Sequence, residues 1–323
     1  MTSCNKSSNI DLSVIIVNFR THEITNECIS SLYRYLTCDF EIIVVDNNSE
    51  DNSKEIITRK HNKIYWIQLN TNMGYGYAIN KGFEKSQGNY ILILNSDIII
   101  LSDFYNSLKE NYVKINAGII GIKLVLPNGK TQPTASTFPT PMTIFANEIK
   151  ILQKIKKFKR YTIQFNADKT IHKVDWVTGA FMFISKEIYQ KISGFNDSYF
   201  MYYEDVDLCK KSNEKGFSNF YLTTHSANHK HNFSVNKHKK AEYNFYKVVE
   251  KESAINYIRQ FYDIKIFNTF IFLYLLIFVI KIIKESILFI LLFFIKRKRE
   301  KLVYSIKTNL IILNKINNYR KFK

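Results

Sequence analysis

Cysteine is scarce in this sequence, and the few cysteines are not spaced for metal binding. The 323-residue chain contains no CxxC pair and no cluster of cysteine ligands, a usage that suits a reducing compartment. It also lacks a P-loop lysine motif, an HExxH motif and a GxSxG motif. The sequence therefore gives no indication of a P-loop nucleotide-binding protein, an HExxH metalloprotease or a GxSxG serine hydrolase. The four cysteines, Cys4, Cys28, Cys38 and Cys209, are expected to be small apolar packing residues.

An apolar leader is absent from the start of the sequence. The first residues, MTSCNKSSNIDLS, are polar and contain no apolar stretch of the kind that signal peptides carry. We therefore expect the N-terminal part of the chain to remain in the cytoplasm.

Acidic residues are also in short supply, and the deficit is concentrated near the C-terminus. The formal net charge is +18 at pH 7. Residues 264–323 contain thirteen Lys or Arg and two acids, which places +11 of the charge there. The same segment holds the most apolar runs, so we expect an anionic membrane surface rather than nucleic acid as its partner.

The first hundred residues alternate between apolar strands and helices. Each apolar run is short and ends in polar turn residues, as in YILILNSD at 90–97, which is typical of strands buried on both faces. This alternation predicts an α/β fold with a mostly parallel sheet flanked by helices, and ligands bind beyond the carboxyl ends of such strands. Strands are expected over 12–17, 40–45, 64–69 and 90–97, with helices over 21–35 (capped by Thr21), 51–59 and 76–86.

The middle of the chain continues this pattern around one irregular interval. Three prolines between residues 133 and 141 and the basic segment 150–160 predict an irregular stretch with a mobile loop. A single apolar strand is expected over 174–185, with Gly179 where the backbone is approached closely. The other elements expected here are helices over 103–113, 186–192 and 204–215, a strand over 119–125 and a hairpin turn at 127–129.

The C-terminal region, from residue 237, is predicted to be helical, basic and membrane-associating. After a helix over 239–261, apolar runs occupy 266–280 and 287–295, separated by a polar break. Neither run reaches the roughly 20 residues that a spanning helix needs, so we expect two short helices that anchor at the membrane interface. The alternatives are one kinked span, which would place the charges of the break near mid-membrane, and a buried helical hairpin.

Four carboxylates stand at or near the ends of predicted strands and helices. Asp46 and Asp97 each follow a strand, and Glu204 with Asp205 opens a helix after an aromatic run. Carboxylates at such positions serve nucleotides, divalent metals or acceptor hydroxyls, whereas the structural alternative is a turn or a helix cap. Three histidines, His225, His229 and His231, follow within seven residues and offer imidazole ligands of the kind that Mn²⁺ accepts.

Six ordered motifs extend from about residue 12 to residue 234. They are SVIIVNFRT, IIVVDNNSED, NMGYGYAINKG, ILILNSD, VTGAFMFIS and GFNDSYFMYYEDVDLCKKSNEKGF. Together they resemble the family 2 glycosyltransferases, which have a GT-A fold, and most of all the bacterial rhamnosyltransferase-like branch that builds O-antigen and other surface polysaccharides. One departure is Ser96, where that branch usually has proline, and it leaves the sugar preference open.

The resemblance implies a division of roles among the candidate residues. Asp97, in a DXD-like turn, would bind Mg²⁺ or Mn²⁺ with His229 as second ligand and His231 as the alternative. Asp205 would be the catalytic base, with Glu204 orienting it or the acceptor. On the donor side, Phe19 would stack on the nucleobase, Asp46 would bond its imide edge, and Gly74, Asn80, Asn95 and Gly179 would shape the pocket; Trp176, Ala180 and Tyr203 would line the acceptor side.

These features together predict a metal-dependent inverting hexosyltransferase with a catalytic domain over 1–236, its nucleotide half over 10–97 and its acceptor half over 98–236. The enzyme would move a rhamnose-like or other hexose from a nucleoside-diphosphate sugar to a lipid-linked or growing surface polysaccharide. It would be peripheral or monotopic at the cytoplasmic face of a bacterial plasma membrane.

The alternative is a catalytically inactive glycan-binding or scaffold protein of the same fold. A sugar-1-phosphate nucleotidyltransferase is disfavoured because residues 14–21 lack its glycine-rich loop.

Overall fold

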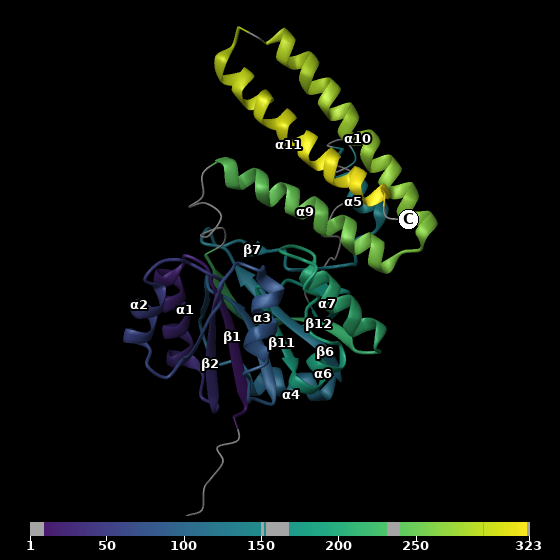
Figure 1. Cartoon of the computed structure of the whole chain (residues 1–323). Helices are drawn as coiled ribbons and strands as arrows, with labels where there is room; N and C mark the ends of the chain where they lie inside the picture. Colours follow the sequence, from purple (N-terminus) through teal and green to yellow (C-terminus); the bar gives the residue numbers. More distant parts are fainter. Residues whose placement is uncertain (1–9, 150–151, 153–167, 231–239, 293, 322–323) are drawn as a thin grey trace, which may run out of the picture. The chain divides into compact units, whose positions relative to one another are not determined.

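A ten-stranded mixed sheet is the centre of the first of two structural units. The computed structural model describes residues 10–149, 152, 168–230, 240–292 and 294–321 (Figure 1). The C-terminal region predicted from the sequence shares its unit with two earlier segments of the chain. The first unit comprises Met1–Phe138, Ile163–Phe200 and Glu204–Lys237, and the second comprises Pro139–Thr162, Met201–Tyr203 and His238–Lys323.

Four parallel strands form one half of the sheet, in the spatial order β3-β2-β1-β4. Strand β1 pairs on both sides, and its side chains from Leu12 to Ile16 are buried, which explains why they are apolar apart from Ser13. Thr21 precedes α1 as predicted, but its hydroxyl donates to Asn18 Oδ1 (3.1 Å) instead of capping the helix. The elements are β1 (Leu12–Asn18), α1 (His22–Tyr35), β2 (Phe40–Asp46), α2 (Ser53–Lys60), β3 (Tyr65–Gln68), α3 (Tyr75–Phe83) and β4 (Tyr90–Asn95).

The other half of the sheet contains an antiparallel strand. Strand β11 (Phe181–Ser185) runs antiparallel between β4 and β6 (Ala117–Val125). Strand β12 (Ser218–His229) is parallel to β6 and also pairs antiparallel with β5 (Ile98–Ile100) at the sheet edge. The prediction of a mostly parallel α/β sheet is therefore confirmed, although β11 is inserted antiparallel between β4 and β6 and β5 is antiparallel at the edge.

The prediction of a single strand over 174–185 is wrong. The structure divides this segment into β9 (Ile171–Val174), β10 (Trp176–Val177) and β11. The division arises because β10 leaves the main sheet and pairs with β8 (Ala135–Ser136) in a separate two-stranded sheet. The backbone N–H of Thr178 then donates to Thr134 O (2.8 Å), and the chain turns at 178–180 before β11 begins.

The remaining turns and helices of the first unit agree with their sequence patterns. The hairpin predicted at 127–129 joins β6 to β7 (Thr131–Gln132), with Gly129 at φ 77°. Gly216, at φ 88°, comes just after the helix that ends at Glu214 and terminates it, as glycine in the left-handed region commonly does. The helices are α4 (Tyr105–Lys114), α6 (Lys186–Lys191) and α7 (Glu204–Glu214).

The second unit consists of helices, and it corrects two sequence predictions. The stretch expected to be irregular contains α5 (Pro141–Asn147), which begins with a capping box between Thr140 and Thr143; the loop predicted at 150–160 lies outside the described residues apart from residue 152. The two short apolar helices are instead one 28-residue helix, α10 (Ile264–Leu291), long and apolar enough by composition to cross a membrane. Its neighbours are α9 (Lys240–Phe261) and α11 (Lys296–Lys321) (Figure 1).

A partly buried ion cluster explains why α10 needs no break at its charged residues. Glu148 accepts hydrogen bonds from Lys251 Nζ (2.7 Å), Tyr274 Oη (3.3 Å) and Lys281 Nζ. Burial alone would raise the pKa of Glu148, but the two lysines outweigh it and lower that pKa. Lys281 is thus paired inside the helical unit, and the helix continues through it.

Gly74 generates the first prediction, because α3 begins there against the backbone of Phe200. Gly74 has φ 96°, and a Cβ added to it would lie 2.2 Å from Phe200 O. Gly74→Ala should therefore lower the free energy of unfolding by the left-handed penalty of about 1–2 kcal/mol plus about 1–3 kcal/mol of overpacking. Urea denaturation followed by fluorescence measures this.

The matched control is Gly129→Ala. Gly129 also has a positive φ, 77°, but an added Cβ would meet nothing within 4 Å. It should show only the left-handed penalty, and equal losses from the two substitutions would contradict the close approach at Phe200.

Candidate active site

The turn after β4 holds Asp97 against His229. Asp97 Oδ1 lies 3.1 Å from His229 Nε2, across 132 residues of sequence, and both side chains are buried. The sheet causes this meeting, because β12 pairs antiparallel with β5 and places His229 opposite Ile98. The backbone N–H of Lys230 also donates to Asp97 O (3.0 Å), which fixes the two segments together.

Gln132 on β7 completes this cluster from the other side of the imidazole. Its Oε1 lies 2.6 Å from His229 Nδ1, so Nδ1–H donates to the amide and Nε2 is directed at Asp97. Sequence reasoning missed Gln132 because it directly precedes the stretch expected to be irregular, and no strand was predicted there. The hairpin turn at 127–129 was the available signal, since it folds β7 back and sets Gln132 opposite Leu124 of β6.

Asp97 and His229 fit a divalent cation. In an octahedral site with bonds of about 2.1 Å, neighbouring ligands lie about 3.0 Å apart, close to the 3.1 Å between Asp97 Oδ1 and His229 Nε2. Across the described part of the chain, no group of three or more His, Cys, Asp or Glu could hold a metal ion, so these two residues would need oxygens from substrate and water to complete a shell. His225 has Asp103, not Asp97, as its nearby charge, and His231 lies outside the described residues.

The turn at residues 178–180 connects the end of β4 to the start of α7. Asn95 N–H donates to Ala180 O (3.0 Å), and Gly179 N–H donates to Asp205 Oδ2 (3.0 Å). A Cβ at Gly179 would lie 3.5 Å from Asp205 Cβ, in ordinary contact. The same short turn therefore touches both the strand that carries Asp97 and the catalytic-base candidate Asp205.

Tyr75 is a second residue that sequence reasoning missed. Its hydroxyl donates to Gly179 O (2.9 Å). Burial raises the pKa of Tyr75, and the negative charges of Glu204, Asp205 and Asp97 raise it further. A neutral phenol thus lies near Asp97 and near the Glu204–Asp205 pair, which follows Asp97 by more than a hundred residues. Its position at the start of a helix after a glycine gave no local signal of this role.

Glu204 and Asp205 occupy different environments although they are adjacent. Glu204 is buried, and its Oε2 has no hydrogen-bond partner within the described residues. Burial, followed by the charge of Asp205, raises the pKa of Glu204 to about 8. Asp205 is partly exposed and accepts backbone N–H groups from Gly179 and Val206 (2.8 Å). The raised pKa favours a neutral Glu204 beside the more exposed Asp205, and two acids in such unlike environments are typical of catalytic acid pairs.

The backbone that leads into this pair is strained. Tyr202 and Tyr203 both have positive φ, at 67° and 65°, although neither is glycine. Consecutive non-glycine residues in the left-handed region cost energy and concentrate at functional sites.

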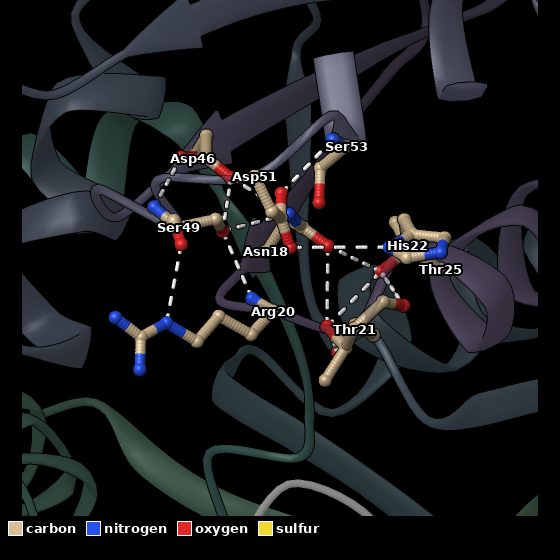
Figure 2. A network of polar contacts seen from close by, with 10 residues as sticks. Asn18, Arg20, Thr21, His22, Thr25, Asp46, Ser49, Asp51 and Ser53 are labelled. Carbon is tan, nitrogen blue, oxygen red and sulfur yellow. Dashed lines mark hydrogen bonds and ion pairs between the residues drawn. The ribbon is translucent and has the colours of Figure 1, made fainter. Parts of the chain in front are cut away.

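Asp46 lies at the centre of a polar network at the carboxyl ends of β1 and β2 (Figure 2). Its Oδ2 accepts from Asn18 Nδ2 (2.7 Å) and Ser49 Oγ (2.5 Å). Its Oδ1 accepts from Ser49 N–H (2.8 Å) and Gln68 Nε2 (2.8 Å). The carboxylate therefore already has four hydrogen bonds, and contact with a nucleobase imide would require one of them to break. An open polar cavity of about 280 Å³ adjoins the network, lined by Asp46, Asn48, Glu50, Asp51, Ser53, Lys54 and Gln68.

Ser96 connects this network to the turn that carries Asp97. Asn18 Oδ1 accepts from Thr21 Oγ1 (3.1 Å) and Thr25 Oγ1 (2.8 Å), as Figure 2 shows. Thr21 Oγ1 in turn lies 3.3 Å from Ser96 Oγ. Proline at position 96 would have no hydroxyl to make this contact. Ser96, which stands where the related branch usually has proline, therefore replaces the stiffness of proline with a hydrogen bond to Thr21 in the loop after β1.

The sequence matches a family model over most of the sheet-forming unit. The model is that of glycosyl transferase family 2, and it covers residues 13–193. The chain belongs to glycosyl transferase family 2. The resemblance drawn from the six motifs is thereby confirmed.

Three relatives of this family 2 chain are named as a hexosyltransferase and two rhamnosyltransferases. It is 27% identical over 212 residues to the low-salt glycan biosynthesis hexosyltransferase Agl10 of Haloferax volcanii, covering 64% of this chain and 63% of that protein. It is 26% identical to the rhamnosyltransferase WbbL of Escherichia coli (67% and 82% covered). It is 20% identical to the N-acetylglucosaminyl-diphospho-decaprenol L-rhamnosyltransferase of Mycobacterium tuberculosis (65% and 73% covered). The match thus spans less than two thirds of the Haloferax protein.

Two solved structures share the fold of the family 2 chain. One is GalNAc-T7 with UDP, GalNAc and Mn²⁺, at a TM-score of 0.52 and 14% identity over 69% of this chain and 44% of that one. The other is Staphylococcus aureus TarS, at 0.50 and 16%, covering 77% and 44%. At such low identity the similarity shows the fold alone, and it confirms the GT-A-like architecture.

Several residues assigned by resemblance to the donor side make contacts within the protein. The guanidinium of Arg20 lies 5.1 Å from the ring centroid of Phe19, on a face where a nucleobase would stack. The side-chain amide of Asn80 donates hydrogen bonds to Phe195 O and Asp197, and it accepts them from Tyr189 Oη and Phe195 N–H. It therefore has no hydrogen-bonding capacity left for a nucleotide sugar. Its contacts tie α3 to residues 189–197, a packing role that the motif did not reveal.

The predicted acceptor-side residues are also placed by packing. Trp176 is buried and donates its Nε1–H to Thr137 O (2.9 Å), and Ala180 is buried in the turn described above. Tyr203 belongs to the second unit, where its ring lies 5.6 Å from that of Tyr257. Of the predicted set, the structure brings together Asp97 with His229, Gly179 with Asp205, and Asn95 with Ala180.

Glu204 generates a prediction about stability and pH. Because its folded-state pKa, about 8, lies above the ordinary value of 4.5, the native state holds a proton that the unfolded state releases. The contribution of this proton to the free energy of unfolding is full below pH 4.5 and is lost as the pH rises from 4.5 to about 8. Over that range the free energy of unfolding falls by up to about 1.4 kcal/mol per pH unit. Glu204→Gln should remove this slope and raise the melting temperature at pH 8.

The control is Glu214→Gln, at the exposed end of the same helix α7. It removes one acid from α7 and should keep the fall in melting temperature with pH. If Glu204→Gln melts with the same pH profile as the parent, Glu204 does not carry the proton.

Proposed function

We propose that this family 2 chain is an inverting glycosyltransferase that moves a hexose from a nucleoside-diphosphate sugar to a hydroxyl of a lipid-linked glycan. The observation that carries the proposal is the meeting of Asp97 and His229 at 3.1 Å, beyond the carboxyl end of a buried strand. The relatives' names support the substrate class, since they are a hexosyltransferase and two rhamnosyltransferases.

Asp97 and His229 would hold a divalent cation, Mg²⁺ or Mn²⁺, against the donor diphosphate. Bound there, the cation would neutralise the negative charge that develops on the departing diphosphate, so no protein acid is needed for the leaving group. Gln132 keeps Nδ1 of His229 protonated and Nε2 available as the ligand atom. The solved relative of similar fold that contains UDP and Mn²⁺ is in keeping with this assignment.

Asp205 is the proposed general base. It is partly exposed, and the backbone N–H groups of Gly179 and Val206 orient its carboxylate. An ionised carboxylate within hydrogen-bond reach of an acceptor hydroxyl takes its proton as the oxygen attacks the anomeric carbon. One displacement inverts the configuration, and no second carboxylate nucleophile is required. Glu204, held neutral by burial, does not compete for that proton and helps to keep the charge on Asp205.

The proposed acceptor is lipid-linked, and the proposed location is the cytoplasmic face of the plasma membrane. One relative is named for a diphospho-decaprenol acceptor, which is a membrane lipid. The second unit of this chain supports the same location through its apolar helix α10 and the net charge of +11 over residues 264–323.

Substituting Asp205 tests the proposed base. Asp205→Asn should lower the rate of transfer by about 10²–10⁴-fold, because an amide cannot take the proton, while affinity for nucleotide and metal stays within about twofold. The rate is measured with a panel of nucleotide sugars and membrane-extracted acceptor lipid, and nucleotide affinity by thermal shift.

Full turnover in Asp205→Asn would refute the assignment of the base. If neither the parent nor any variant transfers or hydrolyses any donor, although nucleotide still binds, the chain is a catalytically inactive glycan-binding protein. Glu214→Gln on the same helix is the control for altering the charge of α7.

Gln132 tests the metal site without relying on turnover. Gln132→Leu removes the acceptor for His229 Nδ1–H, so the imidazole loses its fixed orientation. Affinity for Mn²⁺ should fall by about 10–100-fold, as measured by the electron paramagnetic resonance signal of free Mn²⁺. Gln87→Leu, at an exposed glutamine in the same unit, should bind Mn²⁺ like the parent. Equal affinities for all three proteins would exclude His229 as a ligand that Gln132 positions.

A further inference from the structure

Helix α10 carries a continuous apolar surface that the second unit leaves uncovered. Its members recur at three- and four-residue spacings, so they share one face of the helix. Their exposed fractions range from 36% to 72%. From first to last they extend roughly 28 Å along the helix axis at 1.5 Å per residue. This outer stripe consists of Phe272, Leu273, Leu276, Val279, Ile280, Ile283, Ile287, Ile290 and Leu291.

The charged residues of α10 lie away from the outer stripe or at its edge. Lys281 is paired with Glu148 inside the helical unit. Glu285 accepts hydrogen bonds from Ser305 Oγ (2.7 Å) and Asn309 Nδ2 (2.9 Å) of α11. Lys284 is exposed and lines a shallow apolar hollow beside Ile283, and a lysine at an apolar surface can contribute its methylene stem while its amine stays in water.

The packing of α11 argues against α10 as a membrane-spanning helix. Glu285 fastens α11 to the side of α10 that faces away from the stripe. Residues 296–321 of α11 include nine Lys or Arg and one acid. A spanning α10 would draw this helix into hydrocarbon, at about 2.5–3.5 kcal/mol for each central charge. The length of α10 is therefore sufficient for a span, but its partner helix is not compatible with one.

The charge of the same segment argues for a lipid surface over a second copy of the chain. Two copies joined through the outer stripe would bring together two regions of net charge +11 each, and such like charges repel across an interface. Lys298 and Lys301 are exposed on α11, close in sequence to the end of the stripe at Leu291. Anionic headgroups would neutralise these lysines while the stripe enters the acyl boundary.

We propose that the outer stripe of α10 lies in the interface of an anionic bilayer, with α10 parallel to the membrane plane and α11 on its aqueous side. The chain is then monotopic, and the helix that looks like a span is an in-plane anchor. The inference deepens the proposed function by naming how the enzyme meets a lipid-linked acceptor, and it rests on that function only for the identity of the acceptor.

Vesicle binding tests the anchor. Full-length protein is sedimented with vesicles of phosphatidylcholine containing phosphatidylglycerol. The double variant Ile283→Glu, Ile287→Glu should need at least tenfold more lipid for half-maximal binding than the parent. The control Leu101→Glu, Val113→Glu places the same charges at exposed apolar residues of the first unit and should bind like the parent. Unchanged binding by the stripe variant overturns the proposal.

Depth measurements distinguish an in-plane helix from a spanning one. Tryptophan is placed at Leu273, Ile283 and Leu291 in turn, and the added fluorescence is quenched by brominated lipids. Similar shallow depths at the three positions are expected for an in-plane helix. A deep middle position between two shallow ends would overturn the proposal in favour of a span. A parent that is dimeric on gel filtration, and that the stripe variant makes monomeric, would overturn it in favour of self-association.

Nucleotide binding separates this proposal from the proposed function. The stripe variant should keep the metal-dependent thermal shift of the parent with nucleotide, because α10 belongs to a different unit from Asp97 and His229. Asp205→Asn should in turn bind vesicles like the parent. Loss of vesicle binding with intact nucleotide binding supports the anchor whether or not transfer is observed.

Discussion

The turn at residues 178–180 is the constraint on which the candidate active site depends. It exists because β11 enters the sheet antiparallel beside β4, so the residues before β11 arrive at the end where β4 delivers its polar turn. From there the turn binds Asn95, accepts from Tyr75 and donates to Asp205. Without this reversed strand, the base candidate and the metal candidate would have no common support. A purely parallel sheet would have carried the start of β11 to the opposite edge.

Hydrogen bonding makes the carboxyl ends of the strands rigid. Asp46 receives four hydrogen bonds, and Asn18 passes the network on through Thr21 to Ser96. A buried carboxylate is costly unless its lone pairs are satisfied, and this one is satisfied by its neighbours in the loop. Glu204 is the contrasting case, with an unpartnered oxygen and a raised pKa. The satisfied carboxylate of Asp46 connects neighbouring strands, whereas the unsatisfied one of Glu204 lies next to Asp205, the proposed base.

The second unit solves a different problem, which is how a strongly apolar helix can also carry charges. Glu148 forms ion pairs with Lys251 of α9 and Lys281 of α10, and Glu285 of α10 accepts hydrogen bonds from Ser305 and Asn309 of α11. These pairs keep Lys281 and Glu285 off the outer side of the helix, where Lys284 at the edge of the stripe is the remaining charge in the C-terminal two thirds. The arrangement gives α10 an amphipathic character that its composition conceals, because its inner face is lined with aromatic residues as apolar as the outer stripe. The proposed catalytic site and the proposed anchor thus belong to separate units of the chain.

Local patterns alone were sufficient for the α/β class, for nearly every helix and strand before residue 130, and for the family. Short segments of a few residues contain the signals for these features, because apolar periodicity and turn-forming residues determine where a helix or strand forms. The same short segments misjudged residues 174–185 and the break in α10, since both depend on partners elsewhere: Thr134 for the first, Glu148 and Asn309 for the second. Only the tertiary structure could show that Gln132 supports His229, or that Asn80 and Asp46 have no free hydrogen-bonding capacity. Hydrogen-bond saturation is a property of three-dimensional neighbours, and no spacing along a single sequence records it.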